Sequence, residues 1–192
     1  MGGGHAPSVG RRATSEFPPG WSNEQIIAVI KDVANDPGEA RRRQYNGRWR
    51  CAGERYNVHV IVLVEENGQV HTAYPIAGPG VVRNPDRAKD PANPTVADLQ
   101  DNRISYFADS VLAMFAERLA PADYAHYRSL LWAGEWEELV DVLAAHASIE
   151  DFKLSPDEFS DFEKLLNSYD LPVANCLYLN DREHIIERLR PA

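Results

Sequence analysis

Residues 58–75, VHVIVLVEENGQVHTAYP, decide the fold of the first half of the chain because they predict a β-hairpin. The run before the turn is rich in β-branched residues, and Asn67-Gly68 is a dipeptide that favours a two-residue type I′ turn. Residues two apart on a strand face the same side, so we expect Thr72 and Tyr74 to point together on the returning strand. A hydroxyl beside a phenol can hydrogen-bond a phosphate, which is the first indication of a function.

The composition predicts a globular chain without a membrane span. With 192 residues, 44% of them hydrophobic, the chain can bury a core in one ordinary domain or two small ones. No apolar run approaches the roughly 20 residues that a membrane-spanning helix needs, and the glycine-rich start lacks the pattern of a signal peptide. Cys51 and Cys176 are expected to be reduced thiols, and neither they nor the six histidines show the spacing of a zinc site, so no metal is expected.

The formal charge of −9 is unevenly distributed along the chain. Residues 1–103 carry 13 Lys and Arg against 12 Asp and Glu, a net charge of +1. Residues 104–192 carry 7 against 17, a net charge of −10. A neutral half with clustered arginines can bind a polyanion. A strongly acidic half repels a polyanion, but it can bind the basic surface to which a polyanion binds.

The first half combines one helix with the strands of the hairpin. Ser22 precedes residues 23–35, in which apolar residues recur at helical spacing. Residues 75–94 contain five prolines and are predicted to be a linker that holds at most one short strand. The predicted strands lie at residues 48–52, 56–64 and 69–74.

The second half shows helical spacing almost throughout. Residues 155–158, SPDE, have the pattern of a capping box with proline at the first helical position. Residues 176–179 are predicted as a short strand or an extended turn. Helices are expected at about 104–119, 121–131 and 135–147, after the capping box, and after Asn180-Asp181. The predicted fold class is therefore α+β, with domains at 1–90 and 91–192 that meet inside about 84–103.

The first half resembles the bacterial EndoU ribonuclease family, the toxin domains found at the C-terminal tips of polymorphic and contact-dependent toxins. The resemblance covers about residues 1–85. The resemblance depends on the order in which the matching segments occur more than on any single segment. They are Gly2-Gly3-Gly4-His5, residues 17–22 (FPPGWS), the helix at 23–35, Gly68 in the turn, and Thr72-Ala73-Tyr74-Pro75.

The resemblance implies a fold and an activity. The fold is a small nuclease core of the barnase, EndoU and RelE type with an antiparallel sheet. The activity is RNA cleavage by acid–base transesterification to a 2′,3′-cyclic phosphate, with no metal and no nucleotide cofactor. Both tRNA and general single-stranded RNA would suit as substrate. Such a domain acts in the cytoplasm of a target cell after delivery by its parent toxin.

The resemblance also implies roles for three residues. His5 is expected to be a general acid or base, because histidine exchanges protons near neutral pH and the preceding glycines let the backbone approach a phosphate. Thr72 and Tyr74 match the Thr-x-Tyr pair of the family, which is expected to hydrogen-bond the phosphate and to position a base or sugar. A flexible start for His5 and an ordinary sheet pair for Thr72 and Tyr74 are the structural alternatives.

The chain departs from the family pattern in two places. Family members usually carry a further histidine upstream of the glycine-rich segment, where this chain has Met1, so a domain truncated at its N-terminus is one interpretation of residues 1–90. Animal relatives use a lysine as the phosphate cation, and Lys31, on the polar side of its helix, is a poor candidate. We expect Arg48, Arg50 or Arg43 to replace it, with a solvated surface as the alternative for each.

The acidic second half resembles immunity proteins as a class, by its position, acidity and helical content. An immunity protein, or this half of the same chain, is therefore an expected partner of the nuclease beside the RNA substrate. The alternative hypothesis is an inactive nuclease remnant that acts as a toxin-neutralising or binding protein. A plain RNA-binding protein is disfavoured because basic residues are few. His59 and His71 lie on the predicted strands, where a role in the core or at the surface is commoner than catalysis.

Overall fold

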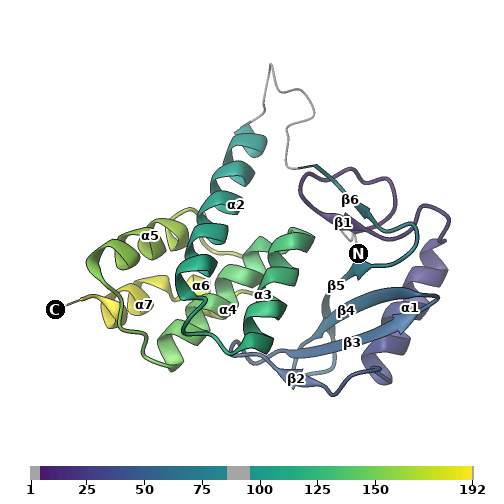
Figure 1. The fold of residues 1–192 in the computed structure, drawn as a ribbon, viewed down its shortest axis with the longest axis horizontal. Coiled ribbons are helices and arrows are strands. Elements are labelled where there is room, and N and C mark those ends of the chain that lie inside the picture. The colour runs from purple at the N-terminus through teal and green to yellow at the C-terminus, as the bar shows by residue number, and fades with distance from the viewer. Residues whose placement is uncertain (1–4, 86–95, 192) are drawn as a thin grey trace. The chain divides into compact units, whose positions relative to one another are not determined.

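The computed structural model describes residues 5–85 and 96–191, and the side chains of the second range from Arg103 onward (Figure 1). The chain divides into two compact units, which are described separately. The N-terminal unit comprises residues 1–87 and 132–134, and the helical unit comprises the remainder. The predicted domain boundary after residue 90 lies outside the described residues and stays a prediction.

The N-terminal unit is built on a four-stranded antiparallel sheet with the strand order β2-β3-β4-β5 (Figure 1). The short strands β1 (Ser15–Glu16) and β6 (Val82–Arg83) pair separately. A helical second half follows, so the α+β fold class is confirmed. The main strands are β2 (Arg42–Arg43), β3 (Trp49–Arg55), β4 (Val58–Val64) and β5 (Val70–Ala77).

Helix α1 (Asn23–Asn35) forms where the sequence predicts it. The hydroxyl of Ser22 accepts a hydrogen bond from Gln25 N at 3.2 Å and so caps the first turn. The buried residues of α1, Ile26, Val29 and Val33, pack with Phe17 and with the valines of β4 in one hydrophobic core. The helix therefore covers one face of the sheet.

The hairpin between β4 and β5 exists, but its turn differs from the predicted type I′. That turn needs a positive φ at both central residues, whereas here Gly68 has a φ of +84° and Asn67 has a negative one. Gly68 N donates to Glu65 O at 2.9 Å, and Glu65 N donates to Gln69 O at 2.8 Å. The Asn67 side chain instead accepts from Gln69 N at 2.9 Å, which favours a three-residue loop with glycine in the left-handed position.

The strands are also longer or shifted relative to the prediction. Strand β3 extends to Arg55 because all seven of its residues pair with β4, and β5 continues to Ala77. The linker predicted at 75–94 therefore begins later, and residues 86–95 lie outside the described part of the chain. Cys51 and Cys176 are both buried, and neither takes part in a disulfide.

The helical unit packs α2 against α4 and α5, and α4 against α6 and α7. Residues 176–179, predicted as a strand or an extended turn, belong mostly to the short helix α6. No helix in the described ranges is both long enough and apolar enough to cross a membrane. The helices are α2 (Val96–Phe115), α3 (Pro121–Ala133), α4 (Trp136–Ile149), α5 (Pro156–Leu166), α6 (Leu177–Asn180) and α7 (Arg182–Leu189).

Candidate active site

The sheet of the N-terminal unit has two chemically different faces. Cys51, Val60 and Val62 point toward α1 and belong to its core. Because side chains alternate along a strand, the intervening residues point to the opposite face. The strand register arranges these residues in two rows, Arg50–Leu63–Thr72 and Ala52–Ile61–Tyr74.

Thr72 and Tyr74 therefore share the face of the sheet opposite α1, as the period of two predicts. Thr72 is half-buried, whereas Tyr74 is fully buried. Arg50 lies in the row of Thr72 two strands away, which corresponds to about 10 Å between their backbones. The two hydroxyls and one guanidinium thus lie along one face, although their roles toward a phosphate stay predictions.

His5 lies against this face through its contact with Tyr74. The centres of the two rings are 5.8 Å apart and the ring planes are inclined by 42°. Strand β1 and the residue after it hold the histidine, since its Nδ1 lies 2.6 Å from Ser15 O and its carbonyl accepts from Phe17 N at 2.9 Å. His5 is only 3% exposed. The preceding glycines, Gly2 to Gly4, lie outside the described residues.

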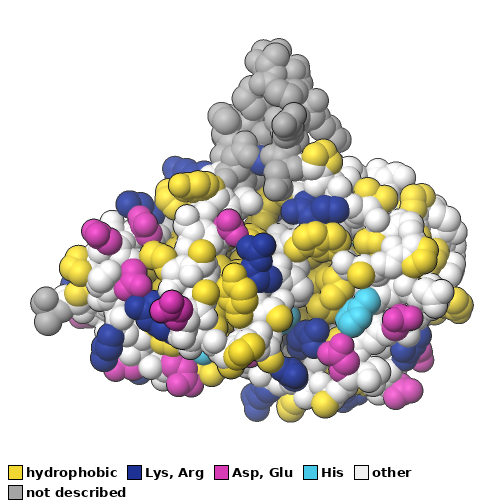
Figure 2. Space-filling view, viewed as in Figure 1, with side chains coloured by type: hydrophobic (Ala, Val, Ile, Leu, Met, Phe, Trp, Pro, Cys, Tyr) yellow, Lys and Arg dark blue, Asp and Glu magenta, His cyan; other side chains and the backbone are white. Residues whose placement is uncertain are grey.

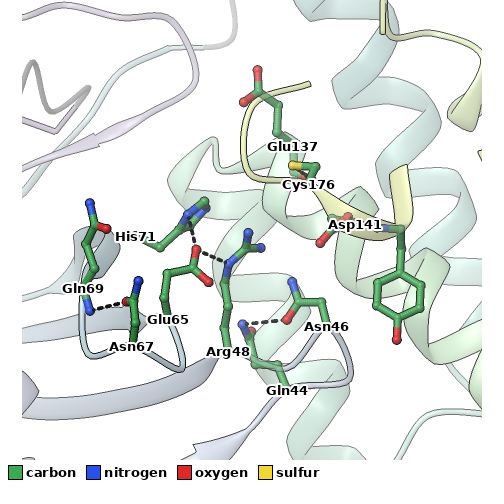
Figure 3. Close-up of polar contacts among 11 residues, drawn as sticks. Gln44, Asn46, Arg48, Glu65, Asn67, Gln69, His71, Glu137, Asp141 and Cys176 are labelled. Atoms are coloured by element: carbon green, nitrogen blue, oxygen red, sulfur yellow. Dashed lines mark hydrogen bonds and ion pairs between the residues drawn. The ribbon is translucent and has the colours of Figure 1, made fainter. Parts of the chain in front are cut away.

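A second polar cluster lies where the hairpin turn meets β5 (Figure 3). One carboxylate oxygen, Glu65 Oε1, lies 2.9 Å from Arg48 Nε and 3.0 Å from His71 Nδ1. The Arg48 side chain is 5% exposed and that of His71 is 14% exposed. Glu65 thus joins the guanidinium of the residue before β3 to an imidazole from β5.

Residues 2–77 match the family of bacterial EndoU nucleases. We refer to this stretch, less than half of the chain, as the EndoU domain. The helical unit has no family assignment, and neither a curated protein nor a solved structure matches the chain. The family indicates a nuclease and suggests RNA endonuclease activity, with RNA as the substrate.

The arginines of the EndoU domain do not converge on one point. Arg50 pairs with Glu39 at 3.2 Å. Arg43 pairs with Glu66 and lies opposite Trp49, with its guanidinium 5.8 Å from the centre of the indole ring. Arg43 therefore points to the α1 side of the sheet, away from Thr72. The neighbouring residue Arg42 pairs with Arg50 and so extends the row of Arg50 and Thr72.

Sequence reasoning missed the contribution of Glu65 to the EndoU domain. It gave Glu65 no role and placed His71 on a predicted strand, where a role in the core or at the surface is commoner than catalysis. The register pairs Leu63 with Thr72 and Val64 with Val70, so His71 is the extra residue of a β-bulge. A bulge changes the direction of a side chain, and no pattern of alternation reveals it.

The remaining histidine of the EndoU sheet, His59, lies in a different environment. Its Nε2 is 3.6 Å from Glu39, and it lies opposite Ala77 near the far end of β5. No group of three or more His, Cys, Asp or Glu residues placed to hold a metal ion occurs within residues 5–85 and 96–191.

Proposed function

We propose that the EndoU domain is an RNA endonuclease that cleaves by transesterification, without a metal ion. The ribose 2′-oxygen attacks the adjacent phosphorus while the bond from phosphorus to the 5′-oxygen breaks. A base takes the proton of the 2′-hydroxyl, and an acid protonates the departing 5′-oxygen. The products are a 2′,3′-cyclic phosphate and a 5′-hydroxyl.

The single observation that supports this proposal best is the contact between His5 and Tyr74 inside the family match. His5 supplies a group that exchanges protons near neutral pH. Thr72, on the same face as Tyr74, supplies a donor for the phosphate oxygens, and Arg50 in its row supplies positive charge as the phosphorane forms. Arg48 and Arg43 remain candidates for contacts to other phosphates of the RNA.

The burial of His5 and Tyr74 bears on how the activity is controlled. At 3% and 0% exposure, neither side chain can touch RNA in the state that the structure describes. We therefore propose that cleavage requires a change that uncovers them, and that the acidic C-terminal half restrains this change as an immunity-type inhibitor. The charge division of +1 against −10 supports that role. In this proposal the domain is a toxin-type nuclease that acts in the cytoplasm of a target cell.

The experiment compares RNA cleavage by the full chain, by residues 1–90 and by the variants His5→Ala and Tyr74→Phe in both. Circular dichroism establishes that each protein is folded. We expect residues 1–90 to cleave faster than the full chain, and both variants to lose 10²-fold or more. Equal cleavage by the full chain and the fragment would contradict inhibition. Folded proteins that never cleave RNA would contradict the nuclease and favour a binding remnant.

A further inference from the structure

Transesterification needs two proton transfers, and His5 accounts for only one of them. The described part of the EndoU domain contains two other histidines, His59 and His71. His71 directly precedes Thr72, whereas His59 lies opposite Ala77 at the other end of β5. Its place next to Thr72, and not its distance from Tyr74, therefore distinguishes His71 as the second group; it lies about 10 Å along β5 from Tyr74.

The surroundings of His71 are those of an oriented proton-transfer group. Its Nδ1 lies 3.0 Å from Glu65 Oε1, a geometry in which Nδ1–H donates to the carboxylate. The neutral ring then carries its lone pair on Nε2, the form that a general base needs, and the carboxylate stabilises the ring when it becomes protonated. The bulge at His71 makes this contact possible beside Thr72.

Arg48 contacts the same carboxylate oxygen as His71. Its Nε lies 2.9 Å from Glu65 Oε1, and its side chain is almost fully buried. A hydrogen bond from a buried guanidinium of this kind fixes the position of the Glu65 side chain. Arg48 then acts on the histidine through Glu65, in addition to any contact with RNA.

We propose that His71 is the second proton-transfer residue of RNA cleavage, and that Glu65 and Arg48 are its positioning residues. This inference rests on the proposed nuclease activity. It assigns one proton transfer to His5 and the other to His71, on either side of the Thr72–Tyr74 pair.

The first test is the pH dependence of RNA cleavage by the full chain and its variants. The pH–rate profile of the wild type should have an acidic and a basic limb, one for each of the two proton-transfer residues. His71→Gln should lose about 10²–10⁴-fold in rate together with one limb. Glu65→Gln should keep both limbs but move the limb of His71 toward lower pH by about one unit, because the carboxylate no longer stabilises the protonated ring. His184→Gln, an exposed site in the helical unit, is the control and should change neither rate nor limbs.

A merely structural role for His71 predicts a different result. In that case His71→Gln would lower the melting temperature and the rate but leave both limbs in place. Cleavage by the wild type combined with two unchanged limbs in His71→Gln would overturn the inference and leave the nuclease standing.

A second measurement does not depend on turnover. The ring signals of His71 are followed by NMR in the full chain while a short RNA with 2′-methoxy groups, which cannot be cleaved, is added. Bound phosphates should raise the pKa of His71, with His184 unaffected. Binding that leaves the His71 titration unchanged would overturn the inference. No cleavage of unmodified RNA by the full chain or by residues 1–90, together with no binding of the methylated RNA, would overturn the proposed function and the inference together.

Discussion

At the scale of single residues, the turn at Gly68 sets the shape of the hairpin that carries the candidate site. Gly68 has a φ of +84°, a region that disfavours side chains, and a Cβ built there would lie in open space. Gly68→Ala should therefore cost about 1 kcal/mol through backbone strain alone. Urea unfolding of the full chain measures this loss.

The matched control for this turn is Gly20, which also has open space around its Cβ position but no positive φ. Gly20→Ala should leave the unfolding midpoint unchanged or raise it slightly, because alanine reduces the freedom of the unfolded chain. A loss of stability at Gly20 equal to that at Gly68 would contradict the strain explanation.

His146 is a buried histidine in the helical unit whose protonation should weaken the fold. Burial lowers its pKa, although Asp123 and Glu150 oppose this shift, and its Nδ1 lies 2.9 Å from the hydroxyl of Tyr127. A lowered pKa means that the unfolded chain binds the proton more readily than the folded one. The stabilisation is therefore present above the model-compound value of 6.5 and lost as the pH falls below it.

The measurement is the melting temperature of the helical unit at pH 7.5 and pH 5.5. The wild type should lose more stability on acidification than His146→Gln does, whereas the exposed-site variant His184→Gln should behave as the wild type. The same loss in His146→Gln as in the wild type would show that other groups cause the acid sensitivity.

At the scale of elements, a buried carboxylate explains why residues 176–179 are helical. Asp141 of α4 is fully buried and accepts hydrogen bonds from Tyr178 N at 2.8 Å and Leu179 N at 2.9 Å, at the start of α6. Asp141→Ala would leave these donors without that partner and should cost about 2 kcal/mol, with Asp141→Asn costing less. Denaturation of the full chain measures both.

Asp161 provides the comparison for this cap, since it is a partly exposed acidic residue of α5 paired with Lys164. Asp161→Ala should change the free energy of unfolding by less than about 0.5 kcal/mol. An equal loss for Asp141→Ala and Asp161→Ala would argue against a capping role for Asp141.

These elements show where sequence reasoning succeeds and where it fails. The capping box of Ser155 and Glu158 is confirmed because both partners lie within one turn of the same helix. The cap that Asp141 provides joins residues 37 and 38 positions apart, which no local pattern reveals. The helix cap at Ser22 and the hairpin were predictable for the same local reason, but the turn type was not, because it depends on the φ of a single asparagine.

The candidate site also has one part that the sequence predicts and another part that it does not. The shared face of Thr72 and Tyr74 follows from the alternation of a strand. The roles expected of His5 and Tyr74 come from the family resemblance and stay predictions. The link between Glu65 and His71 depends on a bulge, and the sequence predicted neither. The carboxylate partners of the arginines were also unpredictable, because long flexible side chains can reach several neighbours.

At the scale of the whole molecule, the charge division along the sequence can be followed on the face that Figure 2 shows. On the face seen in Figure 2, the acidic side chains over the helical unit are interspersed with Lys and Arg side chains. Cleavage by residues 1–90 compared with cleavage by the full chain therefore tests inhibition by the C-terminal half.

Cleavage of RNA by transesterification leaves characteristic ends on the products, and these ends distinguish it from hydrolysis. RNA is incubated with the full chain and with residues 1–90 in the presence of EDTA, and the termini of the fragments are identified by mass spectrometry. The account predicts 2′,3′-cyclic phosphates and 5′-hydroxyls. Products with 3′-hydroxyl and 5′-phosphate ends, or the absence of cleavage by both folded proteins, would contradict it.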